Sequence, residues 1–308
     1  MKKLKIISLV LLLLTVVNTV SYSQQKPVYS QYLFNALAIN PAFAGSQDQI
    51  SITALYRNQW VNFPGAPQIQ TLSGNSALAK KRIGLGFVLT NDVIGVHRDV
   101  SLNLSYAYRI KMPNGNAFSM GLQGGFNAIS SDFDRVNPFD LDDPNLTGFY
   151  NNFIPNFGFG TFYTGKDFYA GFSIPSIRNA KVLQEVVSNS RQRRYYFLSA
   201  GKVYDLNHKL KIKPSTLIRI QERAPIGVDL NLQFIINQKV SVGNSYRSGD
   251  SNISNFEIQF NENFRIGYAY EWVLSKIDNY SRGSHEIMLN YRINIPGLSR
   301  VIYCPTFF

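Results

Sequence analysis

The sequence has a single cysteine, Cys304, among 308 residues, which excludes an internal disulfide. After residue 24 it lacks any run of about 20 apolar residues, so a membrane-spanning helix is excluded there. The short motifs of common hydrolases and phosphate-binding loops are missing, and the three histidines, His97, His208 and His285, lie far apart. These absences predict a protein that is not an enzyme and holds no cofactor.

The amino terminus has the composition of an export signal. Three lysines within the first five residues precede an apolar stretch over 6–17, and the small residues Ser21 and Ser23 follow. That order is typical of a secretory signal peptide cleaved after Ser23. The alternative is an uncleaved anchor, but about a dozen apolar residues are too few for a comfortable membrane span. We therefore predict a signal peptide over 1–23 and an exported mature chain.

Aromatic residues are abundant and charged residues are few. The chain has 22 Phe and 18 Tyr, whereas 16% of its residues are charged. An exported chain of this kind without a spanning helix is either a secreted all-β domain or a transmembrane β-barrel, whose alternation hides its apolar signal. The formal charge of +12 fits a positive lumen or contacts with anionic lipid. Nucleic acid is not expected as a partner, because no basic cluster lies on a predicted helix.

Strands are predicted throughout the chain after residue 49. The clearest is 100–110, where Val100, Leu102 and Leu104 share one face and Ser101 and Asn103 share the other. A period of two residues over this length indicates a strand and not a helix. Equally clear strands start near Ile226, Phe264 and Glu286. Ten weaker ones are predicted at 50–58, 67–77, 82–90, 117–130, 153–164, 167–175, 193–203, 209–220, 239–247 and 253–260, which gives about fourteen antiparallel strands.

The predicted connections alternate in length. Short turns at one end and longer loops at the other are typical of an outer-membrane barrel, whereas a soluble sandwich gives loop length no reason to alternate. We therefore predict an all-β transmembrane barrel over 50–308 in the outer membrane, preceded by a periplasmic strap or plug over 24–49. The short connections are 79–81, 112–116, 165–166, 204–208, 237–238 and 261–263, and the other end carries 59–66, 91–99, 131–152, 176–192, 221–224, 248–252 and 273–284.

Alternation along the predicted strands puts more basic than acidic residues on the face opposite the apolar one. Some of these charges are expected to brace the barrel, and the excess predicts a net-positive lumen that favours an anionic guest. The basic residues are Arg57, Arg109, Lys211, Lys213, Arg219, Arg247, Arg265 and Arg292, and the acidic ones are Asp229, Glu257, Glu271 and Glu286.

The longest predicted loop is acidic. Asp132, Asp134, Asp140, Asp142 and Asp143 fall within it. Calcium prefers several carboxylate oxygens on a flexible loop, but this spacing matches no EF-hand. A solvated polar loop is the favoured interpretation, with calcium as the alternative, and we predict no defined metal site.

An ordered set of motifs resembles a known family. Tyr29-Ser30-Gln31-Tyr32, Asn40-Pro41-Ala42-Phe43-Ala44-Gly45-Ser46, Tyr56-Arg57-Asn58-Gln59-Trp60 and Gly65-Ala66-Pro67 are followed by Lys213-Pro214-Ser215, Tyr246-Arg247, Gly267-Tyr268 and Gly283-Ser284-His285-Glu286. Each motif is weak alone. Together, over about residues 28–293, they resemble the PorP/SprF family of type IX secretion and gliding-motility membrane proteins.

The resemblance implies a function that composition does not. Family members are outer-membrane barrels paired with a large secreted surface protein, often through that partner's type B carboxy-terminal sorting domain. The barrel supports secretion or surface anchoring of the partner, which in gliding cells can be a motile adhesin. The alternative function is a transport channel for hydrophobic compounds, with 24–49 as a plug, and an outer-membrane hydrolase is a more distant one.

We hypothesise that such a partner docks on the extracellular mouth, with a carboxylate reaching into the lumen. Arg57, Arg219 and Arg247 lie near the outer ends of their predicted strands, where arginine can bind a carboxylate through charge-assisted hydrogen bonds. Exposed aromatic residues on the longest loop would need a cover. The candidate aromatic residues are Phe133, Phe139, Phe149 and Tyr150.

Overall fold

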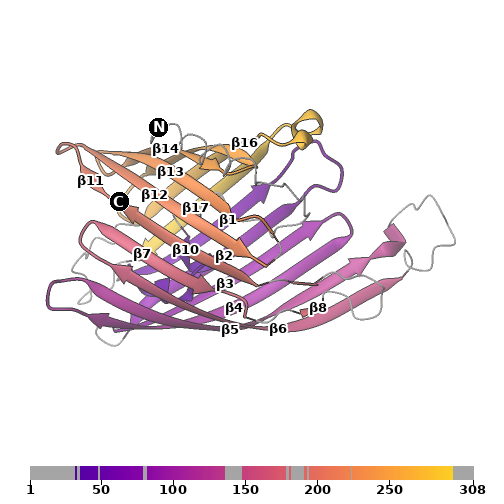
Figure 1. Cartoon of the computed structure of the whole chain (residues 1–308), viewed down its shortest axis with the longest axis horizontal. Helices are drawn as coiled ribbons and strands as arrows, with labels where there is room; N and C mark the ends of the chain where they lie inside the picture. Colours follow the sequence, from indigo (N-terminus) through magenta and orange to yellow (C-terminus); the bar gives the residue numbers. More distant parts are fainter. Residues whose placement is uncertain are drawn as a thin grey trace, which may run out of the picture.

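The computed structural model describes residues 32, 35–47, 49–78, 82–135, 148–177, 180–181, 191–192, 194–222 and 224–293. It is a closed antiparallel barrel of fourteen strands, which confirms the predicted fold and strand count (Figure 1). Most strands match their predicted ranges to within four residues. They are β1 (Ile50–Asn58), β2 (Gln68–Leu78), β3 (Ile83–Ile94), β4 (His97–Lys111), β5 (Ala117–Asp132), β6 (Phe149–Thr164), β7 (Phe168–Ile174), β10 (Tyr195–Lys202), β12 (Leu210–Gln221), β13 (Gly227–Ile236), β14 (Val240–Arg247), β15 (Ser251–Gln259), β16 (Phe264–Val273) and β17 (Ser284–Ile293).

The barrel closes between the first and last strands. Tyr56 of β1 lies opposite Ile287 of β17, and Arg57 lies opposite Glu286. At the far side β10 pairs with β12, so no strand edge of the barrel is left open to lipid. Three short strands lie outside the fourteen of the barrel. β8 (Ala180–Lys181) pairs with β9 (Arg191–Gln192), and β11 (Tyr204–Asp205) pairs with β12. Among the described residues, none forms a helix of the length and apolarity that a membrane crossing needs.

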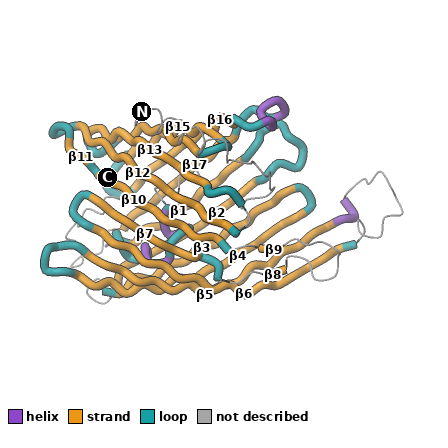
Figure 2. The backbone as a smooth tube through the Cα atoms, in the orientation of Figure 1, coloured by secondary structure: helices purple, strands orange, loops and turns teal. Residues whose placement is uncertain are grey.

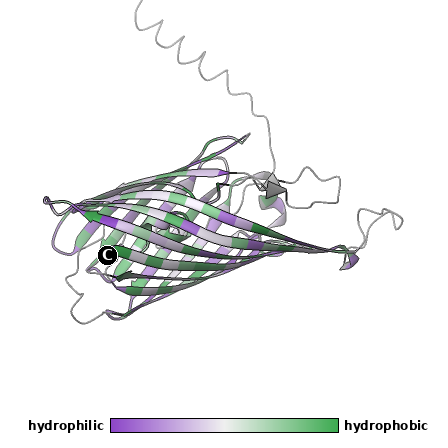
Figure 3. Cartoon of the chain, turned by 90° about the horizontal axis from the view of Figure 1, so that it is seen from below, coloured by the Kyte–Doolittle hydropathy of each residue, from purple (hydrophilic) through white to green (hydrophobic). Residues whose placement is uncertain are grey.

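The two faces of the strands differ as the sequence alternation predicts. Leu104, Leu122 and Leu230 point outward and expose 59%, 61% and 56% of their surface, as lipid-facing residues do when no lipid is counted. Apolar and polar residues alternate in colour along the strands in Figure 3. Outward aromatic residues such as Tyr56 and Trp272 near the extracellular strand ends, and Tyr106 and Tyr108 near the periplasmic ends, form the girdles expected at the two membrane surfaces.

The loops follow the predicted sorting with two exceptions, the extracellular connections 95–96 and 248–250, which are as short as the periplasmic turns. The periplasmic end has short turns, such as residues 237–239 between β13 and β14. The predicted long loop at 91–99 is wrong, because β3 runs to Ile94, β4 starts at His97 and only Gly95 and Val96 connect them. Gly95 has a φ of +57°, which a glycine adopts without strain in so tight a turn. β5 and β6 are the longest strands and project beyond their neighbours at the right of Figure 1.

Residues 35–47, here called the inner segment, lie inside the barrel. The segment contains two short 3-10 helices, η1 (Ala36–Ala38) and η2 (Pro41–Phe43), visible behind the strand wall in Figure 2. Asn40 caps η2, since its Oδ1 atom accepts a hydrogen bond from the Ala42 amide at 2.9 Å. Pro41 then supplies the fixed φ that suits a helix start.

Candidate functional site in the lumen and at its mouth

Six charged side chains form a buried layer just below the extracellular mouth. This mouth network consists of Arg57, Arg219, Asp229, Arg247, Glu271 and Glu286, each exposed by 6% or less. Its members sit near the outer ends of β1, β12, β13, β14, β16 and β17. The alternation of side chains along each strand turns them inward. Three arginines face three acids, so this layer is neutral.

The ion pairs of the mouth network link strands that are adjacent or separated by one strand. Arg57 contacts Glu271 at 2.7 Å and Glu286 at 3.2 Å. Asp229 contacts Arg219 at 2.9 Å and Arg247 at 3.3 Å. Arg247 also approaches Glu271 at 3.7 Å, which joins the two groups of pairs. The desolvation of each charge is therefore offset by partners held in place by the barrel wall.

A second charged layer lies near the periplasmic end. Lys213, Glu257, Arg265 and Arg292 are all buried, and Arg265 Nη1 contacts Glu257 Oε1 at 2.8 Å. Among the described residues this layer contains three cations and one carboxylate, so the predicted positive excess of the lumen lies on the periplasmic side. This distribution corrects the expectation of a positive lumen directly beneath the mouth.

The opposite half of the lumen is filled by the inner segment. Leu37, Ala42 and Phe43 pack against inward residues of the wall that include Val88 and Phe162. Asn40 Nδ2 donates to the carbonyl of Thr161 at 3.0 Å, and Ser173 donates to the carbonyl of Ile39 at 2.6 Å. Arg109 donates to the carbonyl of Gly45, so this predicted lumen cation holds the chain's own backbone.

The wall is shaped for this close approach. A Cβ atom placed on Gly84 would lie 2.0 Å from the carbonyl oxygen of Ala44, and one on Gly121 would lie 2.3 Å from the amide nitrogen of Ala42. No residue other than glycine leaves room for the segment's backbone at these two positions. Tyr32 extends the contact to the other side of the lumen, where its hydroxyl accepts a hydrogen bond from Asn231 Nδ2 at 2.7 Å.

The aromatic residues predicted for partner binding divide between two faces. Phe133 packs edge-on against His97 and Tyr150, with ring centroids 5.7 and 5.6 Å apart. Phe149 lies on the outer face of β6 and exposes 64% of its surface. Phe139 lies outside the described residues. The projecting tip therefore offers one packed aromatic cluster and one exposed ring.

The acidic loop shows no metal site in the part that the structure describes. Asp134 Oδ1 accepts a hydrogen bond from the Gly148 amide at 2.8 Å, and Asp132 ends β5. Asp140, Asp142 and Asp143 lie outside the described residues. Calcium binding at this loop stays a prediction.

The sequence indicated that some inward charges brace the barrel, but it did not give the specific pairs, and the fit of the inner segment was missed. Strand phase identified the inward charges, but it did not reveal that each mouth arginine faces an acid on a neighbouring strand. The glycines at inward positions 84 and 121 were a signal that a backbone approaches closely, and they went unused.

Comparison with known proteins agrees with this architecture. Residues 21–291 match the model of a family described as type IX secretion system membrane protein PorP/SprF. No curated protein matches the chain. The solved CymD monoaromatic hydrocarbon channel is 11% identical with a TM-score of 0.54, over 90% of this chain and 96% of that chain. The Acinetobacter baumannii outer membrane protein Omp33 is 10% identical with a TM-score of 0.46, over 82% of this chain and 100% of that one. At such identities the likeness to CymD shows the fold alone.

Proposed function

Because this chain belongs to the PorP/SprF family of type IX secretion system membrane proteins, we propose that it is a non-enzymatic barrel that supports secretion or surface anchoring of a large secreted protein. The partner docks through its carboxy-terminal domain on the extracellular mouth. Components of the secretion or gliding machinery are further partners. The signal peptide over 1–23 belongs to the same proposal, because an outer-membrane barrel must first be exported.

The observation that carries this proposal is the filled lumen. Inward side chains at successive levels are buried, with Arg57 exposed by 1%, Met288 by 0% and Arg265 by 0%. The side chains that line a water-filled pore would be exposed instead. We assign the inner segment the role of a plug, so the barrel acts as a platform and not as an open channel.

The projecting tip of β5 and β6 is the proposed docking surface. Phe149 is costly to leave in water, and a partner domain that covers it would gain the apolar burial. Phe133 and Tyr150, on the other face of the same tip, form a packed aromatic pair. Direct contact of the partner with Arg57, Arg219 and Arg247 stays a prediction. Such contact would require breaking ion pairs that these arginines already form. An entering carboxylate would have to replace Asp229, Glu271 or Glu286.

The test is co-purification of the partner from the native host in mild detergent. The full-length barrel is compared with a variant that lacks residues 136–147 and with Phe149→Ser. Tyr280→Ser is the matched control, because Tyr280 is an aromatic residue exposed by 73% on another extracellular connection. We expect the large secreted protein to be lost from the first two variants and kept by the control.

Two results would contradict the proposal. One is a partner that stays bound to both tip variants while the barrel stays folded. The other is a steady conductance of the wild-type barrel in a planar bilayer, which would favour the alternative of a transport channel. The fold shared with CymD makes that measurement worthwhile.

A further inference from the structure

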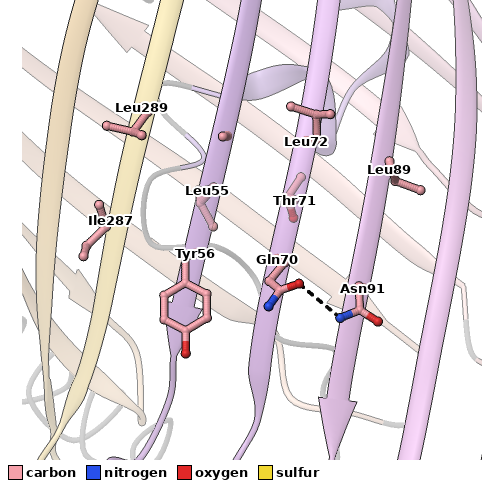
Figure 4. Close-up of a pocket in the computed structure, with 10 residues that line it drawn as sticks. Leu55, Tyr56, Gln70, Thr71, Leu72, Leu89, Asn91, Ile287 and Leu289 are labelled. Atoms are coloured by element: carbon pink, nitrogen blue, oxygen red, sulfur yellow. Dashed lines mark hydrogen bonds between the residues drawn. The ribbon is translucent and has the colours of Figure 1, made fainter.

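A groove crosses the lipid-facing surface where the first and last strands meet. It spans β17, β1, β2 and β3 and has a volume of about 350 Å³ (Figure 4). That volume falls within the range of small-molecule sites, about 300–1,000 Å³. The groove lies on the outside of the wall and is therefore separate from the lumen and from the proposed docking tip.

The groove exists because one small residue sits among large ones. Ala54 on β1 lies directly opposite Leu289 of β17 on one side and Leu72 of β2 on the other. Leu72 in turn lies opposite Leu89 of β3. This row of four outward residues thus has a single methyl group between leucines. The resulting depression is lined mainly by apolar side chains, which suits a hydrocarbon chain.

The next row toward the extracellular side begins with the apolar Ile287 on β17 and is polar from Tyr56 to Asn91. Tyr56 lies opposite Gln70, and Gln70 lies opposite Asn91. Asn91 Nδ2 donates to Gln70 Oε1 at 3.4 Å, as the dashed line in Figure 4 shows. Two amides facing hydrocarbon would be costly to desolvate, so this row belongs at the level of the lipid headgroups.

A fixed cation stands beside that polar row. Arg98 of β4 is exposed on the outer face, and its Nε atom donates to Asn91 Oδ1 at 2.7 Å. Within the part of the chain that the structure describes, Arg98 forms no ion pair. A guanidinium oriented in this way complements a phosphate, which accepts charge-assisted hydrogen bonds from arginine.

We propose that this groove binds one phosphate-bearing lipid of the outer leaflet. An acyl chain lies over Ala54 between Leu72 and Leu289, and the headgroup phosphate contacts Arg98 beside Asn91. The apolar row of the groove suits the acyl chain of an amphiphile, and the polar residues at its extracellular end suit the headgroup. The charge of Arg98 selects an anionic headgroup over a neutral one.

The experiment uses the purified full-length barrel, delipidated in detergent and then incubated with dioleoylphosphatidylglycerol. Native mass spectrometry measures the fraction of barrel that retains one lipid. Ala54→Phe fills the groove, and Leu72→Trp fills it from the neighbouring strand as a second variant. Ala170→Phe is the matched control, because Ala170 is also an outward, exposed alanine but lies on β7, half the barrel away.

We expect both groove-filling variants to lose at least about fivefold in retained lipid, whereas Ala170→Phe keeps it. Arg98→Gln should lower retention of phosphatidylglycerol but leave that of neutral dioleoylglycerol unchanged. Heat-modifiable gel mobility checks that each variant is folded. Equal retention by Ala54→Phe and Ala170→Phe overturns the proposal. So does a wild-type dimer that Ala54→Phe abolishes, since the groove would then hold a second copy of the chain.

Discussion

The two halves of the barrel fill the same lumen in opposite ways. The half formed by β12–β17 and β1 fills it with long charged side chains, which meet in the mouth network and in the periplasmic layer. The half formed by β2–β7 presents glycines and small residues, and a separate stretch of backbone occupies the space. The first half depends on charge pairing and the second on shape, so they should fail under different substitutions.

The largest effect is expected in the charged half. Arg57→Gln leaves Glu271 and Glu286 without their closest cation in a buried layer, which should cost about 3–5 kcal/mol of stability. The midpoint of urea unfolding in lipid vesicles measures this cost. The double variant Arg57→Gln with Glu286→Gln should recover part of it. A midpoint that stays at the wild-type value would show that the network does not brace the wall.

The outer faces of the two halves should behave alike, because both meet the same lipid. Leu230→Arg on β13 and Leu122→Arg on β5 each place a charge against hydrocarbon, at a cost of about 2–4 kcal/mol near the midplane. The yield of heat-modifiable barrel measures both variants. A large cost in one half only would mean that the other half does not face lipid as described.

The fit between the inner segment and the half formed by β2–β7 should be sensitive to a single added methyl group. Gly121→Ala pushes a Cβ against the inner segment and should cost about 1–3 kcal/mol through overpacking. Gly124→Ala on the same strand points into open space and serves as the control. Limited proteolysis within residues 35–47 reports whether the segment is displaced. Equal protease resistance in the two variants would contradict the close fit.

The smallest effect is expected at the cap of the inner segment. Asn40→Ala removes the bond from the Ala42 amide and the bond to Thr161, and should cost about 0.5–2 kcal/mol. The measurable consequence is faster cleavage of residues 35–47, with the unfolding midpoint of the barrel wall little changed. If the wall unfolds together with the segment, the two halves are more tightly coupled than their contacts suggest.

The wall could be predicted from the sequence because its chemistry is local. Alternation over Val100–Ile110 fixes which side chains face lipid, and the lengths of the connections give the orientation of the barrel. The turn at Gly95-Val96 was missed, because polar residues such as Asn91 and Asp99 were interpreted as loop although they continue the pairing of β3 and β4.

The contents of the lumen could not be predicted in the same way. Whether Arg57 meets Glu271 or a guest depends on strands that are 214 residues apart in the chain. Likewise, the inward position of Asn231 does not show that this residue is buried and bonded to Tyr32, 199 residues earlier in the chain. The wall's periodicity carries no information about what fills the space inside.

The inner segment also imposes an order on folding. Its anchor Asn40 bonds to a carbonyl 121 residues later in the chain, and Tyr32 bonds to a side chain 199 residues later. Contacts of such long sequence separation form late, since the entropy of closing the intervening loop is lost before the contact is gained. The segment is synthesised before any strand, yet it can take its final place only once β6 and β13, which carry these partners, are in position. Until then Leu37 and Phe43, buried in the finished protein, remain open to any periplasmic chaperone that recognises unfolded barrels.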